Sequence, residues 1–167
     1  MDLVIAPLDR RHKRKAFDCG EASPNLYLTR YASQDIRRRV SRVFVASPPT
    51  ELQRVIGYYS LSTGSLADAD LPESIRRRLP RYPVPVALLG SLAIDNSFQG
   101  QGFGAVLIAD ALQRIALASQ VMAVYAVIVD ALHESAAAFY RQLGFIPLRS
   151  KPLKLFLPMD TVTKLVD

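Results

Sequence analysis

The chain has 167 residues, and 50% of them are hydrophobic, so its length and composition suit one folded domain, residues 1–167, with a sizeable core. A single cysteine excludes an intramolecular disulfide, and with two histidines we expect no metal site. No apolar stretch of about 18 residues is present to cross a bilayer, and the N-terminus lacks the pattern of a secretion signal. We therefore expect a soluble, cytoplasmic protein without membrane partners. Its net charge of +6 favours anionic partners.

The succession of apolar runs, turns and helical patterns predicts an α/β protein built around a mixed sheet. In chain order the predicted elements are a strand at 2–7, one or two helices within 21–40, a hairpin of strands 42–46 and 55–62, a short helix near 72–79, a buried strand at 84–94, an amphipathic helix at 105–119, a strand at 121–129, a helix at 134–143 capped by Gly144, and strands at 145–146 and 154–157.

A glycine-rich loop, Gly100-Gln101-Gly102-Phe103-Gly104, separates the buried strand at 84–94 from the following helix. Glycines in that position let backbone N–H groups and the helix dipole approach a phosphate closely. The pattern by itself does not name the ligand. A P-loop is excluded because no Gly-Lys-Ser/Thr follows.

A dinucleotide-binding turn is a second interpretation of this loop, since Gly100-x-Gly102-x-x-Ala105 fits that pattern and Asp130 could bind a ribose. Two observations count against it. Residues 95–99 separate the strand from the glycines, where a dinucleotide turn is tight. About 100 residues precede the glycines, which leaves too little chain for the remaining parallel strands. The dinucleotide interpretation is therefore the minor alternative.

The third interpretation is a family resemblance. Gln99-x-x-Gly102-x-Gly104 resembles the Q/R-x-x-G-x-G/A loop of GNAT acetyltransferases, and residues 92–95 before it resemble the family's fourth strand. Residues 138–145, Ala-Phe-Tyr-Arg-Gln-Leu-Gly-Phe, are similar to the family's later "FY…LGF" element. The resemblance implies a GNAT fold, a mixed and mostly antiparallel sheet flanked by helices, with acetyl-CoA as co-substrate. His133 stands where many members have asparagine.

The resemblance also implies site residues. Tyr140 is the general acid toward the coenzyme A thiolate, and the backbone of Leu92, Ala93 and Ile94 holds the thioester carbonyl and pantetheine arm. The pyrophosphate is bound by the loop Gln99, Gly100, Gln101, Gly102, Phe103, Gly104 and Ala105. No carboxylate stands out as a general base, because helix capping explains Asp130 and Glu134 equally well. His133 is a minor candidate for the base. For Cys19 a packing role is favoured over a nucleophile.

The N-terminal half resembles a narrower group. Residues 17–21, 26–46 and 79–90 look like the GNAT toxins of bacterial type II toxin–antitoxin pairs, and with the acetyl-CoA motifs the resemblance covers about residues 4–160. It implies acetylation of the α-amine of aminoacyl-tRNA, which blocks translation. It also implies a ribbon–helix–helix antitoxin and a toxin homodimer. Ser91 replaces an arginine that these toxins often carry, which puts tRNA affinity or amino-acid preference in question.

Charge and amine chemistry agree with that substrate. The α-amine beside an ester has a lower pKa than a lysine, so it needs little help from a base. Arginine triplets can neutralise phosphates: we predict Arg76, Arg77 and Arg78 as acceptor-stem contacts, whereas Arg37 and Arg38 serve tRNA or the antitoxin. Two alternatives stay open, a housekeeping GNAT acting on a small amine or protein N-terminus, and a non-catalytic module that binds nucleic acid or antitoxin.

Overall fold

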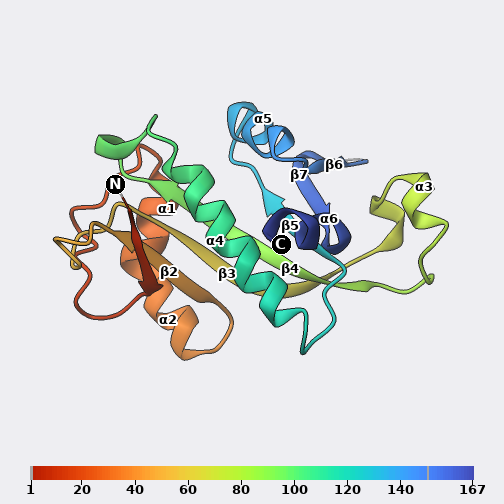
Figure 1. Cartoon of the computed structure of the whole chain (residues 1–167), viewed down its shortest axis with the longest axis horizontal. Coiled ribbons are helices and arrows are strands. Elements are labelled where there is room, and N and C mark those ends of the chain that lie inside the picture. The colour runs from red at the N-terminus through yellow and green to blue at the C-terminus, as the bar shows by residue number, and fades with distance from the viewer. Residues whose placement is uncertain (1, 150) are drawn as a thin grey trace. The chain divides into compact units, whose positions relative to one another are not determined.

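The computed structural model describes residues 2–149 and 151–167 (Figure 1). Its strands are β1 (Val4–Pro7), β2 (Arg42–Ser47), β3 (Gly57–Leu66), β4 (Val84–Ile94), β5 (Ala126–Asp130), β6 (Ile146–Leu148) and β7 (Lys151–Pro158). Its helices are α1 (Ala22–Leu26), α2 (Ala32–Arg37), α3 (Glu73–Arg76), α4 (Phe103–Ala118), α5 (Glu134–Gln142) and α6 (Met159–Val166). A π-helical turn, Tyr27–Tyr31, connects α1 and α2, and single 3-10 turns lie at Asp68–Asp70 and Asn96–Phe98.

The strands form one seven-stranded sheet in the order β1-β2-β3-β4-β5-β7-β6. β4 and β5 pair in parallel, whereas β1–β2, β2–β3, β5–β7 and β6–β7 are antiparallel. This is the predicted mixed, mostly antiparallel sheet. It contradicts the dinucleotide alternative, which requires a run of parallel strands.

The chain divides into two compact units. Unit 1 holds the residues up to Ser62 together with Gly90–Ala111, and unit 2 holds Thr63–Leu89 together with the residues from Leu112 onward. β3, β4 and α4 each run from one unit into the other. We propose on that ground that residues 1–167 form one domain.

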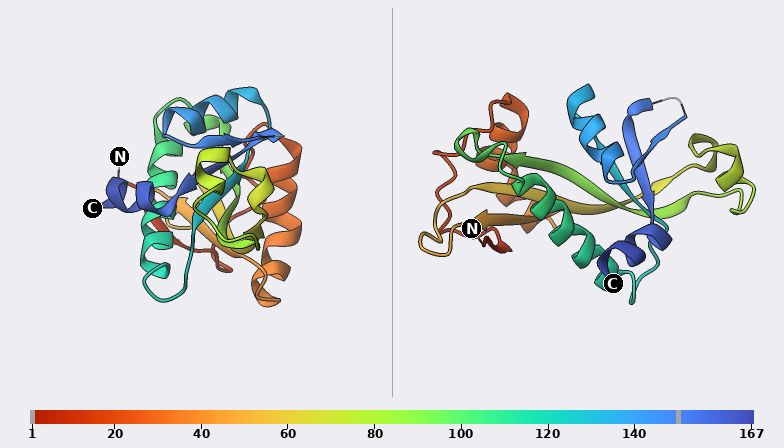
Figure 2. Two further views of the ribbon diagram at one scale, coloured as in Figure 1. Left: turned by 90° about the vertical axis from the view of Figure 1, so that its right-hand side faces the viewer. Right: turned by 45° about the horizontal axis from the view of Figure 1, so that its top comes forward.

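In unit 1, the strands lie between two helical layers, α1 and α2 on one face and α4 on the other (Figure 2). Neighbouring residues of a strand point to opposite faces, and β3 uses this alternation to reach both layers. The Tyr58 hydroxyl donates to the carbonyl of Pro24 in α1 at 2.7 Å. The Tyr59 hydroxyl donates to the carboxylate of Asp110 in α4 at 2.5 Å. Both tyrosines are fully buried, so β3 fixes the two layers to the same strand.

Unit 2 has its own core, in which Val86, Ala126, Ile128 and Phe156 are buried together. The helix α5 packs against β7 and ends where Gly144 adopts a φ of +102°, as predicted for a left-handed cap. The last helix, α6, was not among the predicted elements. It begins directly after Pro158. Proline has no backbone N–H, and at the start of a helix that N–H would have no partner within the helix.

The predicted strand at 121–129 is wrong at its start, since β5 begins only at Ala126. The residues before it close the end of α4 instead: the N–H groups of Val121 and Met122 both donate to the carbonyl of Ala118. These two residues are 87% and 70% exposed. Hydrogen bonding to the free carbonyl groups at the end of α4 therefore outweighs the strand preference of the β-branched residues in this segment.

Candidate active site

The glycine loop connects β4 to α4 within unit 1 and has the geometry of an anion site. Gly100 and Gly102 have φ values of +76° and +83°, the left-handed region that favours glycine. A Cβ at Gly102 would meet no heavy atom within 4 Å, so backbone conformation, not space, requires glycine there. The helix α4 begins at Phe103, and the N–H groups of its first turn have no partner within the helix. Together with the helix dipole they can bind a phosphate.

The loop is held in place by a turn from far away in the sequence. The side-chain amide of Gln99 donates to two carbonyls, those of Cys19 and Ile94, each at 2.9 Å. One carboxylate oxygen of Asp95 accepts from the N–H of Asp18 at 3.0 Å. The sequence predicted Gln99 as a cofactor contact through its backbone N–H, and the structure shows in addition that its side chain anchors the loop. Sequence reasoning missed the support that Asp18 and Cys19 give to this loop.

Replacing Gln99 by alanine should therefore weaken acetyl-CoA binding through the loop. Two hydrogen bonds of about 1 kcal/mol each are lost, so we expect the dissociation constant for acetyl-CoA to rise roughly fivefold to thirtyfold in titration calorimetry. Gln101 is the matched control, since its side chain is exposed and has no hydrogen bond within the described part of the chain. An equal loss in Gln101→Ala would contradict the anchoring role.

The residues predicted to bind the thioester carbonyl, Leu92–Ile94, lie at the end of β4. Ala93 is buried in the core of unit 1, while Leu92 and Ile94 are half-buried. The Ile94 carbonyl accepts from Gln99, so the structure joins this segment directly to the glycine loop. The N–H of Ser91 donates to the Ser60 hydroxyl at 2.8 Å, which fixes the strand just before the segment.

Tyr140 lies on α5 in unit 2, where it is only 7% exposed. Its ring packs against Phe139 and Phe145, with centroids 5.4 Å away in both cases. Burial raises the pKa of Tyr140 to about 12. Its hydroxyl has no hydrogen-bond partner among residues 2–149 and 151–167. The phenol is therefore protonated at neutral pH and has a donor to offer to a ligand.

The other titratable groups considered as catalysts have structural roles. His133 caps α5, because its Nδ1 accepts from the N–H of Ala136 at 3.3 Å. Glu134 forms an ion pair with Arg141. Burial raises the pKa of the Cys19 thiol, as expected for a packing role. Within the described ranges no group of three His, Cys, Asp or Glu side chains could hold a metal ion.

The arginines predicted to contact tRNA lie in both units, and they differ in exposure and in whether they have an ion-pair partner. In unit 2, Arg77 pairs with Glu73 at 3.3 Å across one turn of α3. Arg78 lines a hollow of about 320 Å³ beside Tyr125, and Arg76 is half-buried. In unit 1, Arg37 and Arg38 end α2, and both are exposed. The predicted cofactor segments 92–94 and 99–105 thus share unit 1 with Arg37 and Arg38, and Tyr140 shares unit 2 with the 76–78 triplet.

No helix in residues 2–149 and 151–167 is long and apolar enough to span a bilayer.

Comparison with known proteins agrees with the loop geometry. The acetyltransferase (GNAT) domain family matches residues 39–147. The chain is 39% identical to the tRNA-acetylating toxin of Mycobacterium tuberculosis over 90% of this chain and 89% of that protein. It is 33% identical to the probable toxin TacT of Sinorhizobium fredii over 98% of this chain and 94% of that one.

Solved structures extend the likeness to the whole chain. A tyrosine-to-phenylalanine mutant of KacT superimposes with a TM-score of 0.92 at 32% identity, covering 99% of both chains. AtaT complexed with acetyl-methionyl-tRNAfMet gives a TM-score of 0.90 at 36% identity, covering 99% of this chain and 100% of that one. With the glycine loop at the end of β4 and the seven-stranded mixed sheet, these matches establish that the chain belongs to the GNAT family of acetyltransferases.

Proposed function

We propose that this protein is a toxin that transfers the acetyl group of acetyl-CoA to the α-amine of an aminoacyl-tRNA and so stops translation. One observation carries the proposal: the chain matches, over its full length, an AtaT structure that holds acetyl-methionyl-tRNAfMet, the product such a reaction would leave. The similarity to a tRNA-acetylating toxin points to the same substrate.

Unit 1 supplies the groups that hold acetyl-CoA, a co-substrate with which AtaTR has also been solved. Backbone N–H groups of residues 99–105 bind the pyrophosphate at the start of α4. Backbone N–H groups of Leu92, Ala93 and Ile94 bind the pantetheine arm and the thioester oxygen, where negative charge develops during attack. One such donor contributes about 3 kcal/mol to lowering the barrier.

The chemistry then requires a neutral amine and a stabilised leaving group. The α-amine nitrogen attacks the thioester carbon, a C–N bond forms, and the C–S bond breaks. The amine loses one proton to water, and the coenzyme A thiolate gains one. Tyr140 donates its hydroxyl proton toward that thiolate and regains a proton from water, a role consistent with a phenol kept protonated by burial. A large fraction of the aminoacyl α-amine is neutral near pH 7, so the reaction needs no dedicated carboxylate base.

The biological setting follows from the same relatives. AtaT has been solved with the C-terminus of its antitoxin AtaR. We propose a cognate antitoxin of the ribbon–helix–helix class for this protein, a toxin homodimer, and action in the cytoplasm, where charged tRNA is found.

A reconstituted translation system tests the proposal. Added protein should stop synthesis of a reporter when acetyl-CoA is present, and freshly charged tRNA should restore it for a time. With free coenzyme A in place of acetyl-CoA, synthesis should continue, because no acetyl group is available. Inhibition that is equally strong with coenzyme A would indicate a non-catalytic RNA-binding protein and contradict the proposal.

A further inference from the structure

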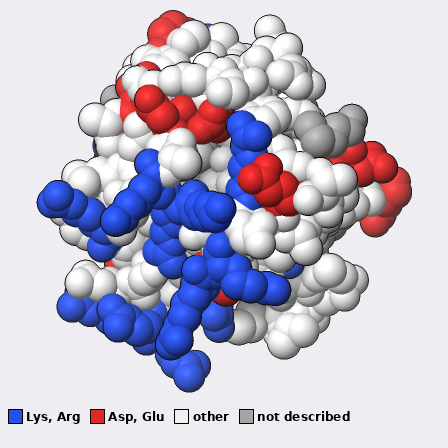
Figure 3. All heavy atoms as spheres, turned by 90° about the vertical axis from the view of Figure 1, so that its left-hand side faces the viewer, with Lys and Arg blue, Asp and Glu red and all other residues white. Residues whose placement is uncertain are grey.

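The N-terminal segment 10–15 carries five basic residues and a histidine, and the proposed mechanism uses none of them. Figure 3 shows lysine and arginine side chains gathered on the face of the molecule that lies at the left of Figure 1. We define the basic face by the exposed cations of unit 1 that line its hollows: Arg10, Lys13, Lys15, Arg37 and Arg54.

The basic face is one continuous surface. The N–H of Lys13 donates to the Gln53 carbonyl at 2.8 Å, which lays segment 10–15 along the loop that carries Arg54. Three hollows of about 620, 410 and 290 Å³ follow one another across it. The first two share Arg14, and the first and third share Lys13. The cations therefore surround a single extended depression.

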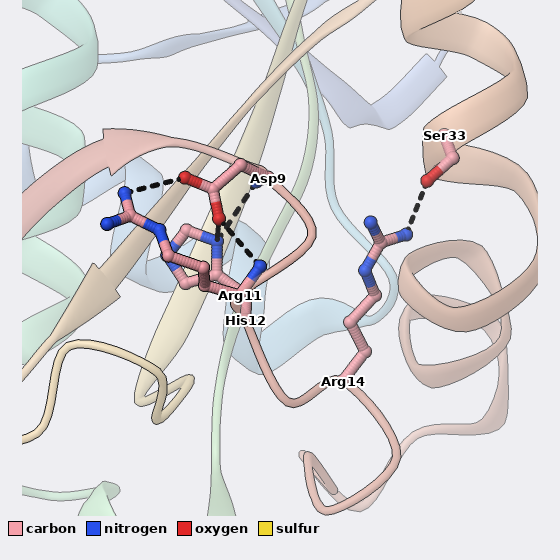
Figure 4. Close-up of polar contacts among 5 residues, drawn as sticks. All are labelled: Asp9, Arg11, His12, Arg14 and Ser33. Carbon is pink, nitrogen blue, oxygen red and sulfur yellow. Dashed lines mark hydrogen bonds and ion pairs between the residues drawn. The ribbon is translucent and has the colours of Figure 1, made fainter.

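Some charged groups in this segment have hydrogen-bond or ion-pair partners within the protein. Arg14 donates to the Ser33 hydroxyl at 2.6 Å, which fixes the segment to α2 (Figure 4). Arg11 forms an ion pair with Asp9 at 2.9 Å. The His12 side chain is 7% exposed and accepts from the Asp9 N–H at 3.1 Å. These contacts give the segment a defined conformation.

The exposed cations that define the basic face have few partners within the protein. The side chains of Arg10, Lys13, Lys15 and Arg37 have no ion pair or hydrogen bond within the parts of the chain that the structure describes. Arg54 has only a 3.9 Å pair with Glu51, and its guanidinium lies over the Phe98 ring at 4.8 Å from the centroid. Such a concentration of unneutralised charge is unfavourable in the free protein and favourable against an anion.

We propose that the basic face binds the phosphate backbone of a helical RNA stem. A single phosphate would need one or two of these cations, whereas five cations along three joined hollows suit a polyanion with regularly spaced charges. The face also extends to the residues that precede the cofactor loop. The third hollow is lined by Lys13 and Arg54 together with Asp95 and Ser97, which lead into that loop. This inference rests on the proposed function in taking the RNA to be the substrate tRNA.

Binding of uncharged, fluorescently labelled tRNA, measured by anisotropy at several salt concentrations, tests the basic face. The test variant is Lys13→Gln with Lys15→Gln. Two lost phosphate contacts should reduce the steepness of log K against log salt by about 1.5 and weaken binding about thirtyfold at 0.1 M salt. The matched control, Lys151→Gln with Lys164→Gln, removes the same charge from exposed positions of unit 2 and should keep the wild-type affinity and slope.

Each outcome decides the proposal. Unchanged tRNA binding in the test variant overturns it. So does a test variant that keeps its tRNA affinity but loses the cognate antitoxin, since the face then serves a protein. The proposed function can fail separately. If the wild-type protein binds tRNA through the basic face but acetylates no aminoacyl-tRNA, the proposed RNA-binding surface is supported and the proposed activity is contradicted. If the test variant acetylates aminoacyl-tRNA normally with an unchanged KM for tRNA, the proposed RNA-binding surface is contradicted and the proposed activity is supported.

Discussion

Replacing Tyr140 by phenylalanine is expected to lower the rate of acetyl transfer about a hundredfold or more, the size of a typical general-acid contribution. Only the hydroxyl is lost, and that hydroxyl has no partner in the described chain, so the packing against Phe139 and Phe145 should persist. Single-turnover kinetics at saturating acetyl-CoA isolates the chemical step. The melting temperature and the dissociation constant for acetyl-CoA should stay near the wild-type values.

Tyr125→Phe is the matched control for this experiment. Tyr125 is half-buried and belongs to the same unit as Tyr140, and its hydroxyl has no part in the proposed chemistry. Wild-type rates in Tyr125→Phe together with loss in Tyr140→Phe would identify the Tyr140 hydroxyl as the group that matters. A Tyr140→Phe protein that is folded and transfers acetyl groups at the wild-type rate would exclude Tyr140 as the acid.

Replacing Gly102 by alanine is expected to weaken acetyl-CoA binding about tenfold. A φ of +83° is strained for an L-residue by about 1–2 kcal/mol, although the added methyl group itself meets no atom. The loop can relieve that strain by turning its N–H groups away from the pyrophosphate, which reduces affinity. Titration calorimetry with acetyl-CoA measures the loss directly.

Gly144→Ala is the control that separates a loss of acetyl-CoA affinity specific to the loop from the strain that any L-residue causes at a positive φ. Gly144 has a φ of +102° after α5, and a Cβ there would make only an ordinary contact of 3.7 Å with Leu157. This variant should lower the melting temperature and leave the dissociation constant for acetyl-CoA unchanged. If both variants weaken acetyl-CoA binding to the same degree, the loss is not specific to the cofactor loop.

Local patterns in the sequence predicted the parts of the site that depend on neighbours in the chain. The glycine loop is read from a few adjacent residues, and β4 was predicted with the bounds it has, because both depend on short-range backbone preferences. The support of that loop was not predictable. Asp18 and Cys19 lie 77 and 80 residues away from the partners that they hold, Asp95 and Gln99.

Side-chain roles were harder to predict than elements. Gln99 fits the family motif, but a pattern cannot tell whether its amide binds a ligand or two backbone carbonyls. The cations of segment 10–15 looked equivalent in sequence. The structure divides them into Arg11 and Arg14, whose side chains have partners, and Arg10, Lys13 and Lys15, whose side chains have none among the described residues. Only the fold decides such a division.

Analysis of the reaction product decides whether this protein acetylates aminoacyl-tRNA. The purified protein is incubated with acetyl-CoA and a mixture of charged tRNAs, and the aminoacyl-adenosine ends released by nuclease are examined by mass spectrometry. We expect N-acetylated aminoacyl ends for at least one amino acid, formed with acetyl-CoA and absent with free coenzyme A. Acetylation of free amines or peptide N-termini, with no acetylated aminoacyl end for any tRNA, would contradict it.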